Sequence, residues 1–119
     1  MPYIICKVDP DAEVILNVKV DKVTGVSDAK TYFEGESPTV HEENEPKTFK
    51  LPVGLGKDIV AKDQPFRCVI TGNPSNPSDT PTATYKLDGV NSPTEPKTVE
   101  GDMITNNLCV FDQSFWFKQ

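Results

Sequence analysis

The chain has 119 residues and a formal net charge of −6, from 18 acidic and 12 basic side chains. This length predicts a single domain over residues 1–119, large enough to bury a core without metals or disulfides. The acidic balance and the lack of a basic block exclude nucleic acid and anionic membrane surfaces as expected partners, because clustered cations bind both.

The first elements in chain order are predicted to be strands. A short β-type run, Tyr3–Val8, ends at a turn signature around Pro10. The next run, Glu13–Val23, alternates apolar and mainly polar residues with a period of two, which predicts a strand with one buried face. The residues expected on that face are Val14, Leu16, Val18 and Val20.

The middle of the chain predicts shorter strands separated by polar, proline-bounded loops. The expected strands are Lys30–Glu34, Thr48–Val53, a stub at Asp58–Val60, and Pro65–Thr71. Glu36–Lys47 is predicted to be a loop. Pro52 indicates that its strand lies at a sheet edge, because proline cannot donate a ladder hydrogen bond.

The C-terminal third predicts strands at Thr82–Leu87, Asn107–Phe111 and Ser114–Phe117. In the last run Phe115 and Phe117 share one face, and Trp116 lies on the other. A strand that is apolar on both faces is either central in a sheet or in contact with a partner. We therefore expect Phe115 and Phe117 to be candidates for an oligomer contact.

About seven to nine short strands with frequent turn signals predict an all-β fold. The expected architecture is an antiparallel β-sandwich, either immunoglobulin-like or jelly-roll-like. The strand and turn at Thr84–Gly89, TYKLDG, is similar to pieces of many immunoglobulin-like repeats. This similarity covers six residues, and no functional residue is transferred from it.

Two segments of the chain echo each other. Thr-Tyr, an acidic residue with Gly, Ser-Pro-Thr and Glu-Pro-Lys-Thr occur in the same order in residues 31–48 and 84–98. One explanation is an internal repeat over residues 13–53 and 65–111, so that two halves form the folding unit. The other is convergence of proline-bounded turns on similar residues, and the sequence leaves both open.

The cysteines and the first residues bear on the cellular location. Cys6, Cys68 and Cys109 form no CxxC or Cys-His pattern, so neither a disulfide framework nor a zinc site is predicted. A Cys6–Cys68 or a Cys68–Cys109 bridge stays open. The first residues lack a basic region and a long apolar run. We expect cytoplasmic synthesis without a signal peptide, with an undetermined final location.

Two sets of residues are candidates for catalysis or metal binding, and neither matches the pattern that the chemistry requires. His41 is the only histidine, and it lies in an acidic stretch with no neighbouring nucleophile in the sequence. Asp9, Asp11 and Glu13 have the spacing that begins an EF-hand, but the glycine and the final glutamate of that loop are missing. We therefore expect no catalytic residue, no metal and no cofactor, and we do not expect an enzyme.

The best candidate for a binding surface is the loop Gly72–Pro81, because loops at the ends of β-sandwiches often carry recognition. Its candidate ligand-binding residues are Asn73, Ser75, Asn76, Ser78 and Asp79, and Trp116 is a candidate stacking platform. The expected function is a non-catalytic binding or assembly module, such as a phage or surface-assembly component, which could form a homo-oligomer. The alternative is a lectin-like carbohydrate-binding protein, and the sequence does not identify a protein or glycan partner.

Overall fold

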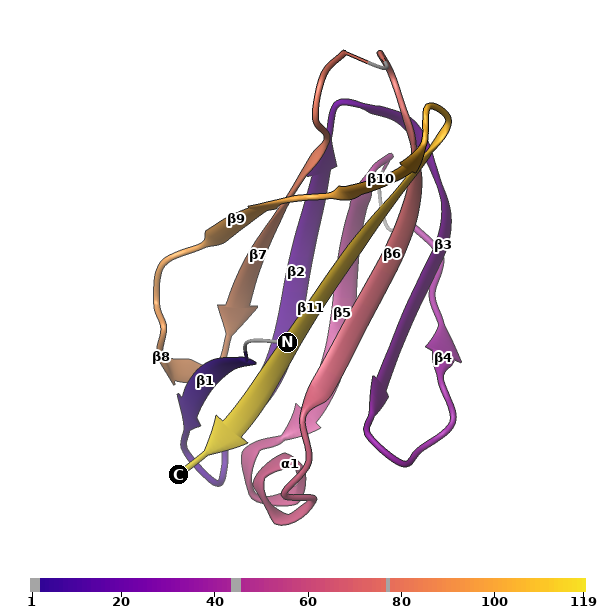
Figure 1. Ribbon diagram of the computed structural model, residues 1–119. Coiled ribbons are helices and arrows are strands. Elements are labelled where there is room, and N and C mark those ends of the chain that lie inside the picture. The colour runs from indigo at the N-terminus through magenta and orange to yellow at the C-terminus, as the bar shows by residue number, and fades with distance from the viewer. Residues whose placement is uncertain (1–2, 44–45, 77) are drawn as a thin grey trace.

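The computed structural model describes residues 3–43, 46–76 and 78–119. Their elements are eleven strands and one short helix (Figure 1). Their bounds are β1 Tyr3–Val8, β2 Glu13–Asp21, β3 Val23–Phe33, β4 Thr39–Val40, β5 Thr48–Leu55, α1 Gly56–Ala61, β6 Phe66–Pro74, β7 Thr82–Asp88, β8 Val90–Ser92, β9 Lys97–Glu100, β10 Asp102–Thr105 and β11 Leu108–Lys118. The all-β prediction is confirmed.

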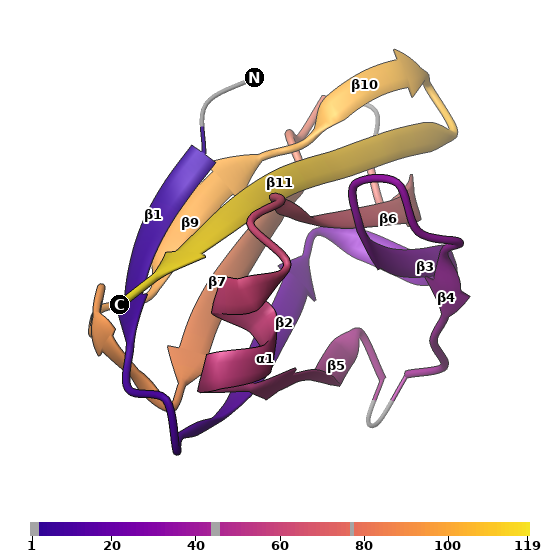
Figure 2. The same cartoon turned by 90° about the horizontal axis from the view of Figure 1, so that it is seen from below.

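The strands form two packed sheets. The large sheet has the order β4-β3-β6-β11-β1-β8, and β10 also pairs with β11. The small sheet has the order β5-β2-β7-β9. All pairings are antiparallel except that of β1 with β11, which is parallel. The segment from β9 to β10 crosses from the small sheet to the large one (Figures 1 and 2).

The predicted alternation determines which side chains fill the core between the sheets. Val14, Leu16, Val18 and Val20 of β2 are all buried, as expected from the period of two. One face of β6 and one face of β7 show the same alternation and are buried in the same way. They comprise Phe66, Cys68 and Ile70 of β6, and Ala83, Tyr85 and Leu87 of β7.

The strand at the C-terminus differs from its prediction. One continuous strand, β11, replaces the two expected strands and lies between β6 and β1. Asp112 and Gln113 interrupt the apolar pattern, but both are hydrogen-bonded where they stand. Asp112 accepts two hydrogen bonds from the guanidinium of Arg67, and Gln113 Nε2 donates to the carbonyl of Ser114 at 3.0 Å. Because these polar groups are satisfied, the strand does not break there.

The predicted strand stub at Asp58–Val60 is wrong, because these residues belong to helix α1. The run was too short to show a helical period. The first amide groups of α1 are held by the β1–β2 turn: the Gly56 N–H donates to the Ala12 carbonyl at 2.7 Å, and the Lys57 N–H to the Pro10 carbonyl at 2.9 Å. Ile59 anchors the helix in the core.

The bounds of other elements also differ from their predictions. β3 begins at Val23, well before the predicted start at Lys30. The predicted loop over residues 36–47 contains the two-residue strand β4, and Asn44 and Glu45 lie outside the described residues. The placement of Pro52 at a sheet edge is confirmed, since β5 is the outer strand of the small sheet.

The two echoed segments occupy different structural environments. Thr31-Tyr32 lies in β3 of the large sheet, with Thr31 facing inward, whereas Thr84-Tyr85 lies in β7 of the small sheet, with Tyr85 facing inward. Residues 13–53 and 65–111 each contribute strands to both sheets. The echoed residues are therefore not structurally equivalent, and an ancestral duplication stays a prediction.

All three cysteines are free and buried in the core. Burial raises the pKa of the Cys6 and Cys68 thiols to about 12, which keeps them protonated at neutral pH. They therefore pack as small apolar side chains, and neither bridge left open by the sequence is formed. Within the described residues, no helix combines the length and the apolar character that crossing a membrane requires.

Candidate functional site

The predicted binding loop lies at one end of the molecule, at the top of Figure 1. Gly72, Asn73 and Pro74 continue β6, so the loop itself is shorter than the predicted Gly72–Pro81. Asn73, Ser75, Asn76, Ser78 and Asp79 are exposed, and Pro77 lies outside the described residues. Pro81 is fully buried and fixes the end of the loop in the core.

Hydrogen bonds join this loop to two neighbouring connections. The Asn73 side chain donates to the Asn107 carbonyl at 3.0 Å, in the β10–β11 turn. The Ser75 N–H donates to the Lys22 carbonyl at 3.0 Å, in the β2–β3 turn. We call the exposed residues of these three connections the end-loop surface: Lys22, Ser75, Asn76, Ser78, Asp79, Asn106 and Asn107.

The loop is ordered by its own side chains. Asn76 Oδ1 accepts from both the N–H and the hydroxyl of Ser78, at 3.0 and 2.9 Å, and the Asp79 N–H donates to the Asn76 carbonyl at 3.1 Å. These bonds form a local turn of the kind that asparagine favours. The Asp79 carboxylate and the Lys22 ammonium remain exposed beside it. A partner would therefore meet a preformed polar surface.

Trp116 lies far from this surface. The end of β6 pairs with the start of β11, through Gly72 and Cys109, whereas Trp116 is near the other end of β11. At about 3.3 Å per residue, seven residues along a strand correspond to roughly 23 Å. Trp116 also contacts the edge of Tyr3, and the Lys118 ammonium lies 4.5 Å from its ring centroid. The predicted loop and stacking platform are therefore not brought together.

Phe115 and Phe117 face the core and are 1% and 2% exposed. Phe115 packs edge-on against Tyr85 of the opposite sheet, with ring centroids 5.8 Å apart. Neither side chain offers surface to a second subunit in this fold. Their burial therefore does not support the oligomer contact predicted for them.

His41 lies on the open side of the sandwich, between β4 and β5. Its backbone N–H donates to the Ala29 carbonyl at 2.9 Å, and its Nε2 is 2.6 Å from the hydroxyl of Thr31, which is buried. Burial lowers the pKa of the imidazole below its usual value of 6.5. The neutral ring can accept a hydrogen bond from the Thr31 hydroxyl, and this bond links the segment after β4 to β3.

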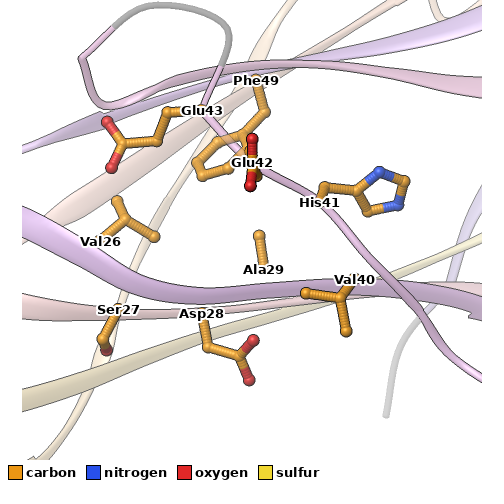
Figure 3. Close-up of a pocket in the computed structure, with 9 residues that line it drawn as sticks. All are labelled: Val26, Ser27, Asp28, Ala29, Val40, His41, Glu42, Glu43 and Phe49. Carbon is orange, nitrogen blue, oxygen red and sulfur yellow. The ribbon is translucent and has the colours of Figure 1, made fainter.

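Two hollows adjoin His41, one of about 330 Å³ and one of about 260 Å³. The larger has an apolar floor that includes Phe49 and an acidic rim formed by Asp28, Glu42 and Glu43 (Figure 3). Figure 3 shows the imidazole directed away from the carboxylates of Asp28 and Glu43. Within the described residues, no carboxylate is hydrogen-bonded to His41, so they contain no acid that orients the base, as a catalytic triad requires.

The Asp9, Asp11 and Glu13 spacing forms no metal site. Asp9 Oδ1 instead accepts a hydrogen bond from Asn91 at 3.0 Å, which ties the β1–β2 turn to β8. In the described parts of the chain, no group of three or more His, Cys, Asp or Glu side chains is placed to hold a metal ion.

The pH dependence of stability should reveal the burial of His41, and a variant tests its contact with Thr31. Because the pKa of His41 is lowered in the folded state, the unfolded state binds the proton first, and stability falls as the pH drops through about 6.5. An NMR titration of this only histidine should give a midpoint below 6.5. In Thr31→Val the midpoint should move. An unchanged midpoint in this variant would contradict the contact.

Comparison of the chain with known protein families, with curated proteins and with solved structures finds no match.

Proposed function

We propose that this protein is a non-catalytic binding or assembly module that recognises a partner through its end-loop surface. The observation that supports this proposal is the hydrogen bonding of three separate connections into one exposed surface. Such a surface loses little conformational entropy on binding, because its loops are already ordered. The exposed groups are mainly amides and hydroxyls, with one carboxylate and one ammonium, so the expected partner surface is polar.

The finer fold class that we propose is immunoglobulin-like. In that fold one sheet contains adjacent strands C, F and G, and the other contains adjacent strands B and E. The neighbours β3, β6 and β11 correspond to C, F and G, β4 extends their sheet as C′ does, and β2 with β5 corresponds to B with E. Strands β7 to β10 would then be an insertion between F and G. A jelly roll gives no such correspondence.

This correspondence supports the location of the binding surface. Variable domains recognise antigen through loops at one end of the sandwich, including the B–C and F–G loops. The β2–β3 turn occupies the B–C position, and the connections after β6 and before β11 flank the F–G insertion. This support is an analogy between folds, so the function depends on the surface itself.

A photo-cross-linking residue at position 106 tests the proposal, because Asn106 is exposed on the end-loop surface and its replacement leaves the Asn76–Ser78 hydrogen bonds in place. In cells that produce the protein, it should capture a partner that is identified by mass spectrometry. The matched control is the same residue at Lys50, which is exposed on β5, away from the end-loop surface. Capture only from position 106 is expected, and equal capture from both positions would contradict the proposal.

The captured partner then allows a direct affinity measurement. Asn76→Ala removes the acceptor that orders the loop, so it should weaken binding by about tenfold, or roughly 1.4 kcal/mol. Lys50→Ala should leave the affinity unchanged. Loss of binding with Lys50→Ala, but not with Asn76→Ala, would place the site elsewhere.

The carbohydrate alternative depends on the same exposed amides and hydroxyls, without a contribution from Trp116. A glycan array probed with the intact protein distinguishes the two functions. A signal that is lost in Asn76→Ala and retained in Trp116→Phe would favour the glycan as the partner.

A further inference from the structure

Most edges of the two sheets are protected against pairing in the described part of the chain, and β8, the outer strand beside β1, has only three residues. β5 contains Pro52 and a bulge, β4 has only two residues, and β9 carries charges at Lys97 and Glu100. β10 begins with an acidic residue and pairs through an irregular register. Charges, prolines, bulges and short strands are the devices by which proteins prevent edge-to-edge association.

The first four residues of β1 lack these devices. β8 pairs with β1 only at Lys7 and Val8, so on that side residues 3–6 have no strand partner among the described residues. The segment Tyr3-Ile4-Ile5-Cys6 contains no charge, no proline and no glycine. The register irregularity of this edge lies at Lys7, after the segment.

Two of these four residues expose large apolar side chains. Tyr3 is 45% exposed and Ile5 is 52% exposed, and both lie on the outer face of the large sheet. Trp116 of the adjacent strand pairs with Ile5 and contacts Tyr3, so the apolar surface extends onto β11. An uncharged, apolar edge of this kind pairs readily with another strand.

We propose that this edge pairs with the same edge of a second copy of the chain, in an antiparallel arrangement about a two-fold axis at Ile4. In an antiparallel pair, opposite residues point to the same face. This register places Tyr3 opposite Ile5 of the second copy, and Ile5 opposite its Tyr3, on the outer face. Ile4 lies opposite its own counterpart on the inner face. Aromatic and β-branched residues are favourable cross-strand neighbours.

The self-complementary register favours a second copy as the occupant, and charge does not oppose it at this edge. Each chain has a net charge of −6, so most contacts between two copies would bring acidic groups together. The edge Tyr3–Cys6 carries no acidic group. The nearest charges on β1 and on the adjacent β11 belong to Lys7 and Lys118. The large sheet would then continue across the axis from one subunit into the other. The two-fold symmetry makes the contact self-complementary and closed.

The paired segment is short, so the buried area is below the roughly 1,200 Å² of a stable specific interface. We therefore expect a weak dimer that forms as the protein concentration rises. Sedimentation velocity over about 10 µM to 1 mM should show a shift from monomer to dimer. A monomer at every concentration would overturn the proposal.

Two variants test the location of the contact. Ile5→Lys introduces a charge on each side of the axis and should abolish the concentration-dependent shift. The matched control is Val40→Lys, at a side chain that is 66% exposed on β4 at the opposite edge of the sheet, and it should leave the shift unchanged. Both sites are exposed, so far-ultraviolet circular dichroism should show an intact fold. A dimer that survives Ile5→Lys, or one that Val40→Lys abolishes, would overturn the assignment.

Disulfide formation tests the register. Mild oxidation of an equal mixture of Tyr3→Cys and Ile5→Cys should give mainly the mixed dimer, because these positions are opposite each other across the axis. Each variant alone should cross-link more slowly, since the introduced cysteines of two identical copies are not opposite each other across the axis. The native cysteines are buried and give little background. Equal yields of mixed and unmixed dimers would overturn the register.

Discussion

Phe115→Ala should lower the free energy of unfolding by about 3–5 kcal/mol, the range for removing a large aromatic side chain from a core. The side chain is 1% exposed and packs against Tyr85 of the small sheet, so it links the two layers. Urea denaturation measures the loss. The loss should be the same at low and high protein concentration, because the residue contributes to the core and not to a subunit contact.

Ile5→Ala is the control for that measurement. Ile5 is exposed, so its truncation should change the stability of the monomer by less than about 0.5 kcal/mol at low concentration. If Phe115→Ala cost under about 1 kcal/mol, its place in the core would be contradicted. A cost that grew with protein concentration would instead favour the oligomer contact predicted from the sequence.

The fold class was predictable because the alternation is strong. In β2 four apolar side chains occur at every second position, and a period of two over that length indicates a half-buried strand. The same signal identified the buried faces of β6 and β7. Pro52 identified an edge because the missing N–H is a property of the residue itself.

The errors occurred where tertiary contacts override local signals. Asp112 and Gln113 suggested a break, but Arg67 of the neighbouring strand satisfies Asp112 and keeps β11 continuous. That partner is 45 residues away in the sequence, so no local pattern indicates it. The contact of His41 with Thr31 has the same origin, since it depends on the pairing of β3 with β4.

The sequence indicated the end-loop surface only in part. The loop after β6 stood out because it contains no apolar residue other than proline. The contributions of Lys22 and Asn107 follow from strand order, which a single sequence does not determine. The β1 edge had a signal that could have been used: an apolar run without a charge or a proline.

Gly56→Ala, which adds a single methyl group, should strongly destabilise this protein. A Cβ at this position would lie 1.9 Å from the backbone oxygen of Asp9, and a backbone atom of a hydrogen-bonded turn cannot move aside freely. Helix α1 would have to move away from the β1–β2 turn, and its two hydrogen bonds to Ala12 and Pro10 would be lost. We expect a loss of about 3 kcal/mol or more in the free energy of unfolding, measured by urea denaturation.

Gly25→Ala is the matched control, because a Cβ there has no heavy atom within 4 Å. Neither glycine has a positive φ, so the comparison isolates the steric contact from backbone strain. Gly25→Ala should be nearly neutral or slightly stabilising, since alanine reduces the entropy of the unfolded chain. Equal effects at the two positions would mean that α1 does not pack against the turn as described.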